Sequence, residues 1–185
     1  GVRFYDRAEV KDLLAYLRVL MNPADDVSLL RIINKPTRGI GKTTLGRLLD
    51  LAAEKGVGVW DAMALAHKDG RFSKGVLRKL DAFRALMEKL QERTDLPLPD
   101  LGGLVLDETG YLAMLRAENT PESDARQQNL AELVGSMGEF EVRHEGATLT
   151  TADWDAIQAM LSLTFDRLHD STSQIEILAE QHFES

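Results

Sequence analysis

The residues with the clearest chemical potential lie between positions 36 and 44, where the sequence reads PTRGIGKTT. Main-chain N–H groups at a glycine corner and at a helix start attract anions, and nearby lysine, arginine and threonine side chains can bind the same phosphate. The ending GKTT fits the nucleotide-binding loop G-x-x-x-x-G-K-[ST], but Pro36 occupies the position of its first glycine. The preceding run, DDVSLLRIINKP, has helical spacing instead of the pattern of a buried strand. The sequence therefore argues against an ATP site here.

The flanking pattern favours a helix–hairpin–helix around the two glycines. Helices are predicted over 26–34 and from Thr43 onward. Glycines at 39 and 41 permit a tight turn, and the isoleucine between them can fill the gap between the two helices. Unpaired amides of the turn would bind phosphate without reading bases. A glycine-rich turn that only joins two core helices is an equally good interpretation of the spacing. The predicted phosphate-binding residues are Thr37, Arg38, Gly39, Ile40, Gly41, Lys42 and Thr43.

Charge is distributed unevenly along the chain. The net charge is −8, and residues 120–185 hold thirteen acids but only three bases, all arginines. Between Val27 and Leu49 there are five bases and no acid. A local basic stretch matters more for phosphate binding than the overall sum, although an ordinary solvated helix face has the same pattern. The acidic half is interpreted as surface that faces away from DNA or docks a basic partner.

Apolar residues recur at helical spacing along nearly the whole chain, which predicts an all-α fold. The expected architecture is an irregular multi-helix domain that contains the Gly-Ile-Gly turn. The segment 96–99, with two prolines, is predicted as a rigid link, and Val142–Thr151 as a strand-like or irregular stretch. The predicted helices cover residues 7–21, 26–34, 43–55, 59–67, 72–93, 101–109, 111–118, 121–140 and 153–168, with a last helix from 171.

Composition limits the other functions that this chain could have. The sequence has no cysteine, which excludes disulfides and thiolate metal sites and favours an intracellular, cytoplasmic setting. Its four histidines have no partner at metal-ligand spacing, so no metal site is predicted. No apolar run is long enough to span a membrane. The sequence does not start with methionine, which is consistent with a piece of a longer protein.

Several stretches, in matching order, resemble the UvrD/PcrA/Rep branch of superfamily 1 DNA helicases. They are RFYDRAEVKD at 3–12, LAYLR at 14–18, NPADD at 22–26, RIINKPTRGIG at 31–41 and ARQQNLAEL at 125–133. The resemblance covers residues 1–146 and implies the all-helical 2B subdomain, an insertion in the second RecA-like motor domain. It assigns residues 1–147 to that subdomain and its TRGIG turn, Thr37 to Gly41, to the backbone of duplex DNA. It implies that residues 1–7 form the hinge to the motor, with Arg3, Phe4, Tyr5 and Arg7.

The resemblance implies an accessory and regulatory subdomain of an ATP-dependent DNA helicase that acts in repair or replication. Its implied partners are duplex DNA, bound weakly and without sequence preference, the motor domains of the parent, and regulatory proteins. The chain lacks ATP-binding motifs, so we expect no cofactor and no enzymatic activity in it; ATP and Mg²⁺ would be bound by the motor domains. Residues 148–185 match no pattern of the family and are predicted as a helical segment packed on the same domain. The alternative, favoured by the acidity of the chain and by this unmatched segment, is a protein-interaction or autoinhibitory module without a direct DNA role.

Overall fold

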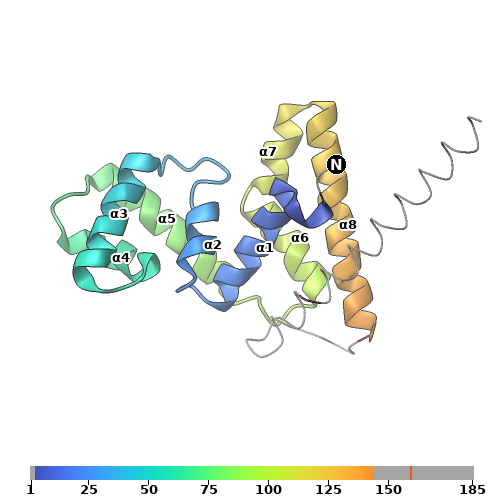
Figure 1. The fold of residues 1–185 in the computed structure, drawn as a ribbon, viewed down its shortest axis with the longest axis horizontal. Helices are drawn as coiled ribbons and strands as arrows, with labels where there is room; N and C mark the ends of the chain where they lie inside the picture. The colour runs from blue at the N-terminus through green and yellow to red at the C-terminus, as the bar shows by residue number, and fades with distance from the viewer. Residues whose placement is uncertain (1–2, 144–158, 160–185) are drawn as a thin grey trace, which may run out of the picture.

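The computed structural model describes residues 3–143 and residue 159, and within these residues every regular element is a helix. This confirms the all-α prediction for the described part of the chain. Two short 3-10 turns, η1 (Phe4–Asp6) and η2 (Ala66–Lys68), accompany the α-helices (Figure 1). The α-helices are α1 (Ala8–Met21), α2 (Asp26–Ile32), α3 (Lys42–Lys55), α4 (Val59–Leu65), α5 (Lys74–Gln91), α6 (Leu98–Glu108), α7 (Tyr111–Glu118) and α8 (Pro121–Arg143).

Local sequence signals account for some of the helix ends. Asp25 caps α2, because its carboxylate accepts the main-chain N–H of Ser28 at 3.1 Å. Gly56 ends α3 in the left-handed conformation, at φ +62°, which a glycine adopts without steric cost. The sequence indicates both ends. An Asp-Asp pair precedes the apolar residues of α2, and a glycine follows those of α3.

Two predicted boundaries are wrong. Helix α6 begins at Leu98, so Pro99 lies in its first turn and not in a rigid link. Proline is tolerated there because its missing N–H would have had no helical acceptor. Val142 still belongs to α8, so the predicted strand-like stretch does not begin at that residue. The rest of that stretch, and the helices predicted over 153–168 and from 171, lie outside the described residues.

Helix α1 lies in the middle of the molecule and packs against α2, α5, α6 and α8. In Figure 1, α3, α4 and α5 lie on one side of α1 and α2, whereas α6, α7 and α8 lie on the other. Residues 42–91, which we call the basic lobe, carry ten Lys and Arg and six Asp and Glu. Residues 98–143, the acidic lobe, carry three Lys and Arg and nine Asp and Glu.

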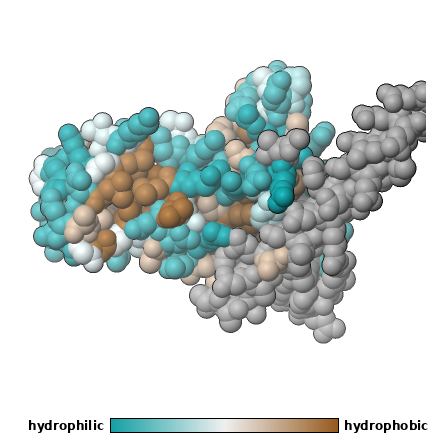
Figure 2. All heavy atoms as spheres, viewed as in Figure 1, coloured by the Kyte–Doolittle hydropathy of each residue, from teal (hydrophilic) through white to brown (hydrophobic). Residues whose placement is uncertain are grey.

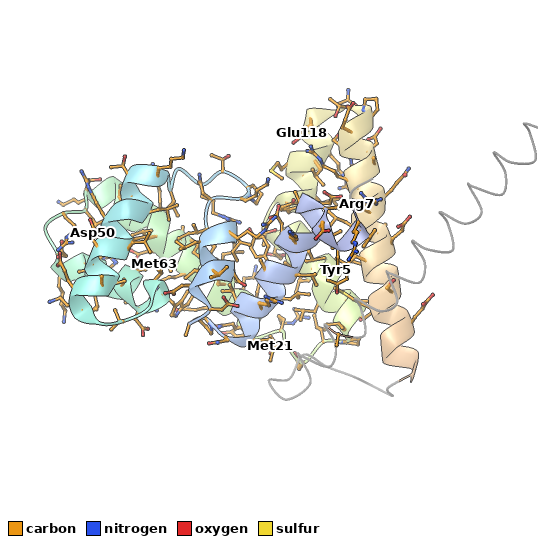
Figure 3. All side chains as sticks on the ribbon, in the orientation of Figure 1. Tyr5, Arg7, Met21, Asp50, Met63 and Glu118 are labelled. Carbon is orange, nitrogen blue, oxygen red and sulfur yellow. The ribbon has the colours of Figure 1, made fainter. Side chains whose placement is uncertain are left out.

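The buried apolar side chains form one cluster that extends through both lobes. Met63 in α4 and Met137 in α8 are fully buried on the two sides, which suits the flexible methionine side chain as a filler of core space. Figure 3 labels Met63 inside the basic lobe, whereas Asp50 lies on α3. On the face drawn in Figure 2, apolar atoms gather over the part of the molecule made by α2 to α5, with hydrophilic atoms along the edges. Within the described residues, no helix is both long and apolar enough to cross a membrane.

Candidate nucleic-acid interface

The turn between α2 and α3 comprises residues 33–41 and is shaped from within by an asparagine. The side-chain Oδ1 of Asn34 accepts the main-chain N–H of Arg38 at 2.7 Å and that of Ile40 at 3.1 Å. Ile40 is fully buried, and Gly39 has φ +71°. A side chain at that φ would be strained, so the backbone alone favours glycine at position 39. Ile40 is thus part of the core, and its role as an apolar plug between α2 and α3 stays a prediction.

Free amide donors remain on the outer side of the turn. Gly41 is the N-cap of α3, and no side chain of the described residues caps this helix. No acceptor within residues 3–143 meets the N–H groups at positions 39, 41, 42 and 43, all of which are exposed. The expectation of unpaired amides therefore holds at the start of α3. It does not hold at Arg38 and Ile40, because both N–H groups are bonded to Asn34.

Arg38 has a different role from the predicted one. Its guanidinium points into the protein, where it lies 5.2 Å from the centre of the Phe83 ring. The expected partner of this side chain was a DNA phosphate, but its donors instead satisfy carbonyls at the C-terminal end of α2. In this structure, the guanidinium is an internal support of the turn. Its acceptors are the carbonyls of Ile32 at 2.8 Å, Ile33 at 3.2 Å and Thr109 at 3.4 Å, and the hydroxyl of Tyr16.

A buried polar network supports the turn from α1. Tyr16 donates its hydroxyl to the carbonyl of Lys35 at 2.5 Å. One turn earlier in α1, the buried carboxylate of Asp12 accepts from Arg31 Nε at 2.8 Å and from the Tyr111 hydroxyl at 2.6 Å. The Nζ of Lys35 lies 3.7 Å from the same carboxylate. The network thus joins α2 and the turn to α7 in the acidic lobe.

The two tyrosines of this network keep their protons. Burial raises the pKa of Tyr16 above its ordinary value, against the opposing effect of the Arg38 guanidinium. Burial, followed by the hydrogen bond to the Asp12 carboxylate, raises the pKa of Tyr111 well above its ordinary value of 10.0. Both phenols are therefore hydrogen-bond donors at physiological pH, and neither is placed to act as a base.

Lys79 of α5 lies at the turn, although no sequence pattern predicts it there. A Cβ added to Gly39 would lie 2.8 Å from Lys79 Nζ and 3.0 Å from its Cε. The end of the Lys79 side chain therefore lies against the turn, in the space that glycine leaves. In the sequence, Lys79 cannot be distinguished from a solvated lysine on an amphipathic helix. Only the packing of α5 beside the turn brings it to the candidate site.

The predicted hinge residues lie in η1 and next to it. The asparagine of the ARQQNLAEL motif, Asn129 in α8, accepts a hydrogen bond from Arg7 Nη1 at 2.6 Å. Asn129 in turn donates to the buried carboxylate of Glu9 at 2.7 Å. Figure 3 labels Tyr5 and Arg7 beside α1 and α8. Arg3 is exposed, Tyr5 and Arg7 are half-buried, and Phe4 is buried.

A polar pocket of about 340 Å³ opens beside the turn, but its charges are already paired. Lys35 and Thr37 line one side, and Glu118 and Arg126 line the other. Arg126 forms an ion pair with Glu118 at 3.4 Å, and Lys35 faces Asp12 at 3.7 Å. The pocket is thus less suited to a phosphate than the exposed start of α3. Within residues 3–143, no three His, Asp or Glu side chains are grouped to hold a metal ion.

Comparisons with known proteins agree on one group. A protein-family model described as the UvrD-like helicase C-terminal domain matches residues 1–179, and so extends beyond residue 147. ATP-dependent DNA helicase PcrA of Bacillus subtilis is 39% identical over 150 residues, which are 80% of this chain and 20% of that protein. ATP-dependent DNA helicase UvrD1 of Mycobacterium bovis is 40% identical over 155 residues, 83% of this chain and 20% of the relative. The chain spans about a fifth of the length of these curated relatives.

Proposed function

Because the chain belongs to the UvrD-like helicase C-terminal domain family, we propose that it is the 2B-type accessory subdomain of an ATP-dependent DNA helicase. In this proposal the chain holds duplex DNA while the motor domains of the parent, which bind ATP and Mg²⁺, pull one strand. The names of the relatives support the helicase assignment. The order of the TRGIG and ARQQNLAEL motifs supports the subdomain assignment.

The free donors at the start of α3 are the observation that carries the DNA contact. Helix α2, the turn and α3 form the proposed helix–hairpin–helix. The exposed amides of Gly41, Lys42 and Thr43 lie at the positive end of the α3 dipole, which favours a phosphate. The side chains of Lys42, Thr43 and Thr37 are exposed and can add donors. Arg38 and Ile40 act on DNA only indirectly, by keeping the turn in shape.

A substitution at Gly41 tests this contact without disturbing the turn. Gly41 has φ −86°, an ordinary value for any residue, and a Cβ there would meet no atom within 4 Å. Gly41→Val therefore covers the amides but leaves the backbone unstrained. Gly46→Val is the matched control, because Gly46 lies on the same helix, is exposed and also has open space around it.

The measurement is a titration of a fluorescent DNA duplex with the 185-residue chain. We expect weak binding by the chain alone, on the order of 10⁻⁴ M at physiological salt, with a steep salt dependence. Gly41→Val should weaken binding by about tenfold at low salt, since hydrogen bonds to charged groups contribute about 1.5–3 kcal/mol. Equal affinity of Gly41→Val, Gly46→Val and wild type, with circular dichroism unchanged, would remove the start of α3 from the mechanism.

A second candidate function is the binding of a protein partner, and the charge of the acidic lobe favours it. Nine acids against three bases give residues 98–143 a surface that suits a basic partner. A purified motor fragment of the Bacillus subtilis relative is a suitable probe, added to the chain in trans. Salt-sensitive, saturable binding that weakens when exposed acids of α8 are neutralised would support this function. Absence of binding at low salt would count against it.

A further inference from the structure

Within residues 3–143, two cations of α5 have an acidic partner, whereas Lys74, Arg78 and Lys79 have none. Lys89 forms an ion pair with Glu108 at 2.9 Å, and Arg84 approaches Glu88 at 3.7 Å. Lys79 has no hydrogen bond or ion pair with any residue of the described part of the chain, and its side chain is exposed. The ammonium nevertheless lies against the turn, in the space that a side chain at Gly39 would fill.

Several positive features therefore converge on this corner of the molecule. The N-terminal end of α3 has an uncapped dipole, and Lys42 in its first turn has no ion pair within residues 3–143. The Nζ of Lys79 adds a full charge from a different helix. Like charges brought together without an internal anion repel one another, and an external anion relieves that repulsion. The arrangement suits a phosphate that binds from outside.

We propose that Lys79 is a further phosphate-binding residue, so that the DNA site extends from the start of α3 onto α5. A backbone phosphate that accepts hydrogen bonds from the amides of Gly41 and Lys42 would also be contacted by Lys79 Nζ. The inference rests on the proposed function, because it adds a ligand to the same site. It also gives position 39 a second reason to be glycine, since a Cβ there would displace the lysine.

Salt dependence provides the first test. Duplex affinity of the full 185-residue chain is measured by fluorescence anisotropy over a range of salt concentrations, for Lys79→Ala, Lys42→Ala and Lys55→Ala. Lys55 is an exposed lysine at the far end of α3 and is the matched control. Loss of one phosphate contact lowers the slope of log affinity against log salt by about 0.9. We expect that decrease, and affinity about fivefold lower at low salt, for Lys79→Ala but not for Lys55→Ala.

A double-mutant cycle separates a direct contact from a general loss of structure. Gly39→Ala should displace the Lys79 side chain and so lower the salt slope of the wild type. In the Lys79→Ala background, Gly39→Ala should have little further effect on that slope. Lys79→Arg should restore most of the slope, since an arginine can also bind a phosphate. Thermal unfolding of each variant shows whether Gly39→Ala, which is strained at φ +71°, is still folded. If it is not, the Lys79→Ala and Lys79→Arg pair alone decides the question.

The outcomes distinguish this inference from the proposed function. If Lys42→Ala lowers the slope and Lys79→Ala behaves like Lys55→Ala, the start of α3 binds DNA and the role of Lys79 is overturned. If all three variants match wild type, both the proposed DNA contact at the start of α3 and the proposed role of Lys79 are contradicted. A slope lowered by both Lys42→Ala and Lys79→Ala, and recovered in Lys79→Arg, supports the extended site.

Discussion

The basic and acidic lobes are built alike but differ in what their surfaces can bind. Each contains three α-helices, of which α5 in the basic lobe and α6 and α8 in the acidic lobe pack against α1, and the two lobes share one core. The basic lobe has an excess of four positive charges, ten minus six, and the acidic lobe an excess of six negative charges, nine minus three. The net charge of −8 therefore conceals a surface suited to phosphate. This difference teaches that the charge of a whole chain is a poor guide to nucleic-acid binding when opposite charges are separated in space.

Asp12 connects the two lobes, and its removal is expected to have the largest effect. Its side chain is almost fully buried and accepts hydrogen bonds from Arg31 and Tyr111. Asp12→Ala would leave both donors without their acceptor, and should lower the free energy of unfolding by about 3 kcal/mol. Denaturant unfolding measures this loss.

Asp6→Ala is the control for that experiment. Asp6 forms only an exposed ion pair with Lys11, at 3.8 Å, and its loss should change the free energy of unfolding by less than about 0.5 kcal/mol. Equal losses for the two variants would show that Asp12 does not connect the lobes energetically.

Tyr111, on the acidic side of the same network, gives a smaller effect that depends on pH. Near pH 7, Tyr111→Phe should cost about 1 kcal/mol through its lost hydrogen bond to Asp12. The raised pKa of the folded phenol means that, above pH about 10, the unfolded chain releases this proton while the folded chain keeps it. Wild type therefore loses stability as pH rises through that range, and phenylalanine has no such dependence.

The stability difference between wild type and Tyr111→Phe should accordingly narrow between about pH 8 and about pH 10.5. Tyr16 titrates in both proteins and cancels from the difference. Denaturant unfolding of wild type and Tyr111→Phe at both pH values measures this difference in the free energy of unfolding. A difference that widens with pH would contradict the hydrogen bond between Tyr111 and Asp12.

The smallest effect is expected from the surface of the acidic lobe. Glu122 and Asp124 lie in the first turn of α8 and are exposed. Within residues 3–143 neither carboxylate forms an ion pair with Lys42 or Lys79, and salt weakens the field of exposed charges over a Debye length of about 10 Å at 0.1 M. Glu122→Gln combined with Asp124→Asn should therefore change duplex affinity by less than about twofold, in the anisotropy assay used for Lys79. A large gain in affinity would indicate that the acidic lobe lies beside the duplex. It would contradict the assignment of DNA binding to the basic lobe alone.

The periodicity of the sequence predicted the fold well because helix formation is mostly local. The Asp25 cap and the Gly56 stop follow from single residues next to apolar runs. The start of α6 was missed because Pro99 can either break a helix or occupy its first turn, and the choice depends on tertiary packing. Patterns of neighbouring residues thus predicted the elements but not every boundary.

The candidate site was predicted less completely, because long-range contacts decide it. The turn was located from its two glycines, but the sequence does not show that Arg38 points inward to Tyr16 and Thr109. An arginine beside a glycine turn has the same pattern whether it faces solvent or the core. Lys79 lies forty residues after Gly39, and no spacing rule joins two positions so far apart. Whether these groups bind DNA remains a prediction for the assays described above.

The hydrogen bonds of Arg7 have a mechanical consequence. Asn129 forms side-chain hydrogen bonds with both Arg7 and Glu9. These bonds attach the start of α1 to the long helix α8. A domain rotates about backbone bonds of residues that are not fixed to it by such contacts. We therefore expect that any pivot between this chain and a neighbouring domain at its N-terminal end lies before Arg7, and that Arg7 moves together with α8.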